Sequence, residues 1–366
     1  MARLSCVCRL VALSLMVMLP AAVLAQGAAE GVNIFTIDGV KLRGAYYPAE
    51  KKCNATVILL HPIGEGKNMK APEWRALAEA LQKANCSVLM FDFRGHGDST
   101  TIDDEKAFWG ARAANGNFPN AALVRSKSKD TIEVRDYIKQ IGAYGPVLIN
   151  DIAAARAYLE RRNDTTKDAN TSNLIVIGAD TGGTLGAIWI NSEWSRCKYT
   201  PPPNPMFMKG QFESRSEGAD IIGAVFLSID PKLDKSRTIS LPSVLKVPCK
   251  DHAMAALFLA GKDEIKYNKT LESKLKVKGN KHQYIGAVPL ETNLSGVKLL
   301  TKGLKTDEAI VKYLSNVIDD RKNEWMEREY DKNVYMWRLP NGGGILSKKK
   351  GDRSLVFDDY TRFISQ

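Results

Sequence analysis

After its first 25 residues, the 366-residue chain has no apolar run that approaches the roughly 20 residues needed to cross a bilayer, which excludes a membrane transporter. The sequence has no C-x-x-C pair and no Cys/His pattern with the spacing of metal ligands, so no metal site is expected. No organic cofactor is indicated either. With 44% hydrophobic and 25% charged residues, the composition is that of a globular protein and excludes disordered or collagen-like chains.

Residues 1–25 have the features of a secretory signal peptide. Arg3 and Arg9 precede an apolar stretch that ends at Leu19, and Val23 and Ala25 stand at the −3 and −1 positions of a small-residue cleavage site. The apolar stretch is too short for a spanning helix, and an uncleaved anchor is the less favoured alternative. We therefore expect a secreted or periplasmic protein with no transmembrane segment after cleavage.

Basic residues outnumber acidic ones. The net charge is +11 for the whole chain and +9 once Arg3 and Arg9 leave with the signal peptide. Lysines and arginines are spread among acids, with one dense cluster at Lys348–Lys350, and no nucleic-acid motif accompanies them. We expect no nucleic-acid partner. The expected partner is a small molecule or a surface partner, whose identity the sequence leaves open.

Short buried strands alternate with helices along the chain. Asp38-Gly39 between Val32–Asp38 and Val40–Tyr47 predicts an antiparallel hairpin. Apolar runs predict further strands at Thr56–Leu60, Ser87–Phe93, Leu174–Ile177, Ile222–Ile229, Ala255–Ala260 and Gln283–Val288. Helical spacing of apolar residues predicts helices from Pro72, through Leu148–Leu159 and from Thr306. The pattern predicts an α/β fold, with a mainly parallel sheet, the N-terminal hairpin, helices on both faces, and ligands at the carboxyl ends of the strands.

Three further features occur in order along these strands. His61-Pro62 ends one strand, Phe91–Ser99 reads FDFRGHGDS, and a strand, a turn and a helix meet at Gly178–Gly183. With these features, residues 32–320 resemble the α/β-hydrolase superfamily. The resemblance implies a hydrolase-like domain at 26–320, with insertions at 101–146 and 198–217, and a C-terminal extension at 321–366. The first insertion is a candidate cover for the pocket, and the aromatic residues of the extension are expected to pack on the domain.

The family's nucleophile stands in a G-x-S-x-G turn between a strand and a helix. Gly178 and Gly182 fit this pattern, but Asp180 replaces the serine. The chain is similar here to haloalkane dehalogenases and epoxide hydrolases, in which an aspartate attacks carbon and forms an ester on the enzyme. A weaker alternative takes Thr181, or a serine elsewhere, as the nucleophile of an esterase or peptidase.

The histidine that would activate water to hydrolyse such an ester is missing. The resemblance places it near residues 288–293, where the sequence reads VPLETN. Of the four histidines, His61 and His96 occupy turns that are usually structural in the family. His252 and His282 are expected at the amino ends of strands, far from the site.

Other parts of the family's site have candidates. Asp263 matches the acid position after the penultimate strand, and Asp230 offers a second place for it. The resemblance implies an oxyanion hole formed by the backbone N–H groups of Ile63 and Thr181. In the absence of histidine, Asp263 or Glu291 would have to activate water.

Four cysteines follow the expected cleavage site, and an even number in an exported protein suggests two disulfides with three possible pairings. The strand order implied by the resemblance brings Cys53 next to Cys86, and Cys197 next to Cys249, at the amino end of the sheet. We predict these two disulfides.

Two hypotheses of function remain. The favoured one is a secreted α/β-hydrolase-like protein whose catalytic machinery has degenerated, a possible pseudoenzyme with a binding or structural role. Dehalogenase-like enzymes carry a helical cap after their sixth strand, but the segment between Ile229 and Ala255 is too short for one. The favoured hypothesis accounts for the loss of the serine, the histidine and this cap together. The alternative is a hydrolase in which Asp180 attacks an ester, epoxide or haloalkane-type small molecule.

Overall fold

The computed structural model describes residues 29–110, 118–203, 210–235, 237–280, 284–321, 323–339, 342–347, 350–355 and 357–364. The expected signal peptide, His282 and most of the lysine cluster at 348–350 lie outside these ranges. Within them, no helix is both long enough and apolar enough to span a bilayer.

The main sheet contains the strands predicted from the apolar runs. In the described chain its order is β1-β2-β4-β3-β6-β9-β10-β11, with β5 paired to β2. The strands are β1 (Glu30–Phe35), β2 (Val40–Tyr47), β3 (Ala55–Leu60), β4 (Cys86–Phe91), β5 (Thr101–Ile102), β6 (Leu174–Ala179), β9 (Ile221–Leu227), β10 (Ala255–Ala260) and β11 (Ile285–Pro289). Strands β1, β2 and β5 are antiparallel to their neighbours, and β4, β3, β6, β9, β10 and β11 run parallel to one another. The predicted fold class is confirmed.

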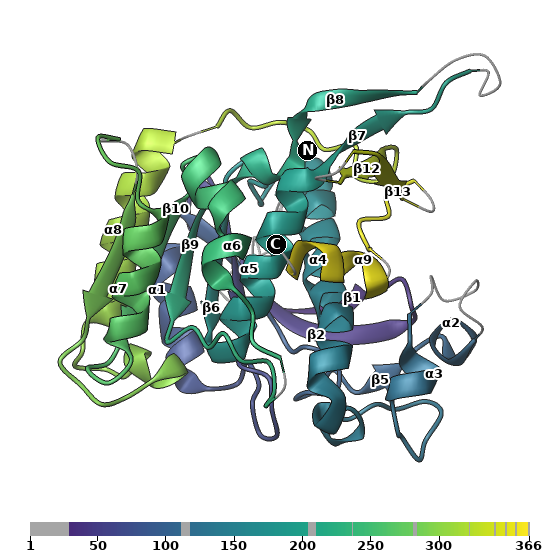
Figure 1. Cartoon of the computed structure of the whole chain (residues 1–366), viewed down its shortest axis with the longest axis horizontal. Helices are drawn as coiled ribbons and strands as arrows, with labels where there is room; N and C mark the ends of the chain where they lie inside the picture. The colour runs from purple at the N-terminus through teal and green to yellow at the C-terminus, as the bar shows by residue number, and fades with distance from the viewer. Residues whose placement is uncertain are drawn as a thin grey trace, which may run out of the picture.

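Helices cover both faces of this sheet (Figure 1). One apolar core lies between the sheet and α1 (Pro72–Lys83) and α8 (Thr306–Arg321), and the other lies against α4 (Ile141–Thr165), α5 (Asp180–Ser195) and α7 (Ile265–Leu275). Strands β3, β4, β6, β9 and β10 are buried along their whole length because both faces are covered.

Two predicted strands end earlier than expected. The strand expected to reach Phe93 stops at Phe91, because the Phe93 N–H leaves the ladder and donates to His61 Nε2 at 3.0 Å. The strand expected to reach Ile229 stops at Leu227, because Ser228 takes a positive φ of 48° and turns the chain.

Helix α4 is longer than its apolar spacing indicates, and it contains Pro146 near its start. Proline has no N–H to donate to the carbonyl of Gly142, four residues earlier. That carbonyl instead accepts a hydrogen bond from Arg237 Nη1 at 2.5 Å, so the helix continues through the proline.

The insertion at 101–146 packs against the body through α2 (Glu105–Trp109) and α3 (Asn120–Leu123). Phe108 and Phe118 are buried in the core on the α4 side. Buried Asp38 links this insertion to the body, because its carboxylate pairs with Arg94 and also accepts a hydrogen bond from Asn120 of the insertion. These two aromatic side chains pack in the core, and the role of the insertion as a pocket cover stays a prediction.

The insertion at 198–217 and the C-terminal extension form a second sheet together. Its order in the described chain is β13-β12-β7-β8, made of β7 (Arg196–Thr200), β8 (Gln211–Ser216), β12 (Val334–Arg338) and β13 (Gly344–Leu346). This sheet lies at the upper right in Figure 1, above α9 (Phe357–Ile364). The extension buries Tyr335, Trp337, Leu355, Tyr360 and Phe363 in the core that contains α4 and α5.

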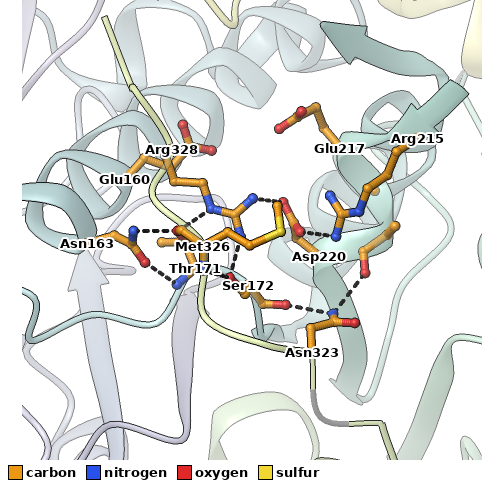
Figure 2. Close-up of polar contacts among 12 residues, drawn as sticks. Glu160, Asn163, Thr171, Ser172, Arg215, Glu217, Asp220, Asn323, Met326 and Arg328 are labelled. Carbon is orange, nitrogen blue, oxygen red and sulfur yellow. Dashed lines mark hydrogen bonds and ion pairs between the residues drawn. The ribbon is translucent and has the colours of Figure 1, made fainter. Parts of the chain in front are cut away.

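A buried ionic cluster fixes the start of the extension (Figure 2). Arg328 Nη1 pairs with Asp220 at 2.8 Å, and its other nitrogens donate to Thr171 and Ser172 at 3.1 and 2.7 Å. Asp220 also accepts from Arg156 at 2.9 Å. Arginines of the extension therefore neutralise carboxylates of the body.

The two predicted disulfides are not formed. Cys53 Sγ hydrogen-bonds Ser87 Oγ at 3.4 Å, whereas Cys86 points into the core beside α1. Successive side chains of a strand point to opposite faces, so the thiol of Cys86 faces away from that of Cys53. Cys197 lies in β7 of the second sheet, where its thiol donates to the Met336 carbonyl at 3.4 Å instead of meeting Cys249.

Candidate active site

Asp180 stands at the turn where β6 passes directly into α5. Its φ is +47°, a left-handed conformation that aspartate rarely adopts outside constrained turns. Small residues permit this turn. A Cβ on Gly178 would lie 2.5 Å from Gly183 Cα, and a Cβ on Gly182 would overlap the His61 carbonyl. The predicted strand, turn and helix around Asp180 are therefore present, and the carboxyl projects from the carboxyl end of the sheet.

The Asp180 carboxyl is half-buried, and no group in the described chain hydrogen-bonds it. The pKa of Asp180 is raised to about 6, mainly by burial and then by the charge of Glu264, while the charge of Lys67 opposes both. A carboxylate of this kind is poorly solvated but is still largely ionised above about pH 7.

One cavity of about 680 Å³ opens from Asp180 toward the loops after β9 and β10. We call it the acidic cavity, because three further carboxylates line it with two lysines: Asp230, Asp263, Glu264, Lys232 and Lys266. Asp263 therefore shares a cavity with Asp180. Glu291, the other candidate base, instead pairs with Lys262 at 2.7 Å on the surface.

A second cavity of about 520 Å³ also reaches Asp180 and lies beside the loop after β3. We call it the basic cavity, because Lys67, Lys70 and Lys298 line it together with Glu73. The described parts of the two insertions contribute no lining residue to either cavity. Asp180 thus lies between two cavities of different charge.

One of the two N–H donors of the expected oxyanion hole already makes a hydrogen bond. The Ile63 N–H donates to Thr181 Oγ1 at 2.9 Å, so the side chain of one expected residue occupies the donor of the other. The Thr181 N–H adjoins Asp180 in the turn, and the hydrogen bond to Thr181 brings the Ile63 N–H beside it. A change in the χ1 rotamer of Thr181 would move Oγ1 away and release the Ile63 N–H for a substrate oxygen, and the oxyanion assignment stays a prediction.

A family model described as alpha/beta hydrolase fold matches residues 55–198, which contain β3, β4, β6 and the turn at Asp180. The chain has the α/β-hydrolase fold. An esterase from Pyrococcus furiosus has a similar structure, with a TM-score of 0.48 and 18% identity over 79% of this chain and 90% of that one. For a dienelactone hydrolase from Anabaena variabilis, the TM-score is 0.44 at 16% identity, over 80% and 98% of the two chains.

One curated protein also matches part of this chain. It is a thiohydrolase from Aspergillus aculeatus, which is 38% identical over 80 residues. The match covers 20% of this chain and 24% of the thiohydrolase. The chain therefore spans about a quarter of the length of that relative.

In this chain the loop after β11 brings a glycine, not a histidine, against Asp180. Gly296 has a φ of +54°, and a Cβ at this position would overlap the Asp180 carboxyl. The backbone of Gly296 thus fills the space beside Asp180. Sequence reasoning did not single out Gly296, although Gly after a predicted strand is a signal of a tight turn.

Two histidines hold the loop that carries Ile63. His61 Nε2 accepts from the Phe93 N–H, and His96 Nε2 accepts from the Gly64 N–H at 3.1 Å. Burial lowers the pKa of His61 to about 4 and that of His96 to about 3, so both rings are neutral at physiological pH. His252 stacks on Trp194 with ring centroids 4.1 Å apart. The Nε2 atoms of His61 and His96 therefore accept hydrogen bonds from backbone N–H groups and do not act as bases toward water.

Two residues that were not predicted from the sequence affect the pKa of Asp180. Glu264 follows Asp263 directly, and its charge raises the pKa of Asp180. Lys67 lies in the loop that begins at His61-Pro62, and its charge lowers that pKa. Both positions are in loops after predicted strands, so their place at the carboxyl edge of the sheet was a usable signal.

Proposed function

We propose that this protein is a hydrolase in which Asp180 attacks a carbon atom of an ester, epoxide or haloalkane-type small molecule. The observation that supports this most directly is the Asp180 carboxyl itself. It stands on the strained turn between β6 and α5, accepts no hydrogen bond within the described chain, and opens into two cavities. A poorly solvated carboxylate held in this way is a stronger nucleophile than one in water.

The reaction has two steps. A carboxylate oxygen of Asp180 forms a bond to the electrophilic carbon while the bond to the leaving group breaks and that group takes the electron pair. A halide departs as the anion; an ester alkoxide departs, and an epoxide oxygen stays attached through the second ring carbon, each taking a proton from water. Water then attacks Cγ of the resulting enzyme ester, which releases the product as an alcohol and regenerates the carboxylate. An ester substrate, attacked at its carbonyl carbon, gives an anhydride that water opens in the same way.

The second step needs a base and a place for the developing oxyanion. Glu264 and Asp263 line the acidic cavity with Asp180, and the effect of Glu264 on the pKa of Asp180 makes it the base that we propose. It takes a proton from the attacking water and returns it to the leaving alcohol. The N–H groups of Ile63 and Thr181 would stabilise the oxyanion on Cγ once the χ1 rotamer of Thr181 has changed.

A second candidate function is binding without turnover. It is favoured by two contacts, the Thr181 hydroxyl on the Ile63 N–H and the Gly296 backbone against Asp180. These contacts occupy positions that a hydrolase of this fold needs for an oxyanion and for a base. In this case the acidic and basic cavities beside Asp180 would hold a ligand that is released unchanged.

The test uses the purified protein against aryl esters, epoxides and haloalkanes, with single-turnover reactions in water enriched in oxygen-18. For an aspartate nucleophile, the label enters the peptide that contains Asp180 and the first product stays unlabelled. We expect Asp180→Asn to reduce turnover by about a thousandfold or more. We expect Glu264→Gln to let the enzyme ester accumulate, which mass spectrometry of the intact protein detects.

Asp263→Asn is the matched control, because it removes a carboxylate of the same cavity that has no assigned role in our mechanism. Undiminished turnover in Asp180→Asn, or label in the product alone, would contradict the aspartate mechanism. Labelling by a fluorophosphonate probe would instead support a threonine or serine nucleophile. If a folded protein turns over none of the three substrate classes, the binding candidate is favoured.

A further inference from the structure

The two cavities that meet at Asp180 differ in charge, and this difference restricts what can bind on each side. The acidic cavity carries three carboxylates beyond Asp180 against two lysines. The basic cavity carries three lysines against Glu73. An anionic group is therefore repelled from the first cavity and attracted to the second.

The three lysines of the basic cavity are not equivalent. Lys70 pairs with Asp98 at 2.9 Å, and Lys298 pairs with Glu73 at 2.6 Å. Lys67 forms no ion pair in the described chain, and it is the cation whose charge acts on Asp180. The ammonium of Lys67 is thus available to a ligand and lies close to the reacting carboxyl.

The backbone around Lys67 holds the residue in a defined turn. The Lys67 N–H donates to the Gly64 carbonyl at 3.1 Å, and the Gly64 N–H is held by the neutral ring of buried His96. Gly64 and Gly66 have positive φ values of 147° and 70°, which this tight turn requires. The loop therefore presents the lysine stem at the mouth of the basic cavity instead of leaving it on a free segment.

We propose that the basic cavity binds a carboxylate group of the substrate at Lys67, so that the substrate is a small monoanion whose reacting carbon lies over Asp180. This inference rests on the proposed function for the reaction, but the binding that it describes needs no turnover. A single unpaired ammonium matches a single negative charge. A dianion would place a second charge near Asp180 and the carboxylates of the acidic cavity, where it is repelled.

The test compares benzoate with benzamide, which has the same shape and no charge. Binding is followed by chemical shifts of the backbone amides of Ile63 and Thr181 in the full-length protein. We expect benzoate to bind about two- to fivefold more tightly than benzamide, the scale of an exposed ion pair. We expect Lys67→Met to remove this preference and Lys67→Arg to retain most of it.

The matched control is Lys266→Met, which removes a lysine from the acidic cavity on the other side of Asp180. It should leave the benzoate preference unchanged. Equal binding of benzoate and benzamide, or loss of the preference in Lys266→Met instead of Lys67→Met, would overturn the proposal. Lys67 is exposed, so its variants are expected to fold, and thermal unfolding checks this.

Asp180→Asn separates this proposal from the proposed function. The variant should bind benzoate at least as tightly as the wild type, because a nearby negative charge is removed. If Lys67-dependent benzoate binding is found and no carboxylate-bearing ester, epoxide or haloalkane is turned over, the proposed hydrolase fails and the anion site stands. If turnover is found but shows no preference for anionic substrates, the hydrolase stands and the anion site fails.

Discussion

Replacing Arg328 with methionine should detach the C-terminal extension from the body at a calculable cost. The guanidinium is buried and makes three hydrogen bonds, to the Asp220 carboxylate and to the hydroxyls of Thr171 and Ser172 (Figure 2). Breaking a buried ion pair by removing one partner typically costs about 3–5 kcal/mol. Asp220 keeps Arg156 at 2.9 Å and Arg215 at 2.6 Å, so its charge stays compensated. We therefore expect the lower end, about 3 kcal/mol.

Arg215→Met provides the matched control, because Arg215 pairs with the same carboxylate from a more exposed position. Its loss should cost about 1 kcal/mol or less. Both variants are measured by urea unfolding, and limited proteolysis reports whether the chain after residue 323 becomes cleavable before the body. A cost for Arg328→Met below about 1 kcal/mol, or equal to that of Arg215→Met, would refute the view that this arginine fixes the extension.

Two further predictions concern Asp180 and the cysteines. Because the pKa of Asp180 is raised to about 6, mainly by burial, the folded state binds more protons than the unfolded state between about pH 4 and 6, and stability is lost as pH rises through this window. Asp180→Asn should thus be more stable than the wild type at pH 7, by up to about 3 kcal/mol. This gain in stability, measured by thermal unfolding, should shrink toward about pH 4. A gain that does not depend on pH would contradict the raised pKa. For the cysteines, the absence of Cys53–Cys86 and Cys197–Cys249 bonds means that dithiothreitol should not lower the melting temperature, whereas loss of a native disulfide would cost about 2–5 kcal/mol. Burial raises the pKa of Cys86 to about 12, so this thiol should react slowly with a disulfide reagent until the protein unfolds.

The sequence by itself determined the sheet and the position of the candidate nucleophile. Runs such as Ala55–Leu60 and Leu174–Ala179 are apolar throughout because both faces of these strands are covered, and that pattern is local. The turn at Asp180 is also local, since the glycines that permit it lie within a few residues. A single chain therefore sufficed to place Asp180 at the carboxyl end of the sheet.

Only the tertiary structure decided what surrounds that carboxyl. Gly296, Lys67 and Glu264 follow three different strands, and their approach to Asp180 depends on how the loops close over the sheet edge. The disulfide prediction was wrong for a related reason. Strand neighbours fix which cysteines are near, but the face on which each side chain points depends on register, and Cys86 points away from Cys53.

The position of the C-terminal extension depends on contacts between residues that are far apart in the sequence. Its aromatic residues indicated that it would pack on the body, but the partners of Arg328 come from segments more than 100 residues away. Local sequence patterns report which residues are buried. Which charge meets which other charge inside the protein is set by the packed chain, because such pairs are stable only where burial, geometry and remaining hydrogen bonds are satisfied together.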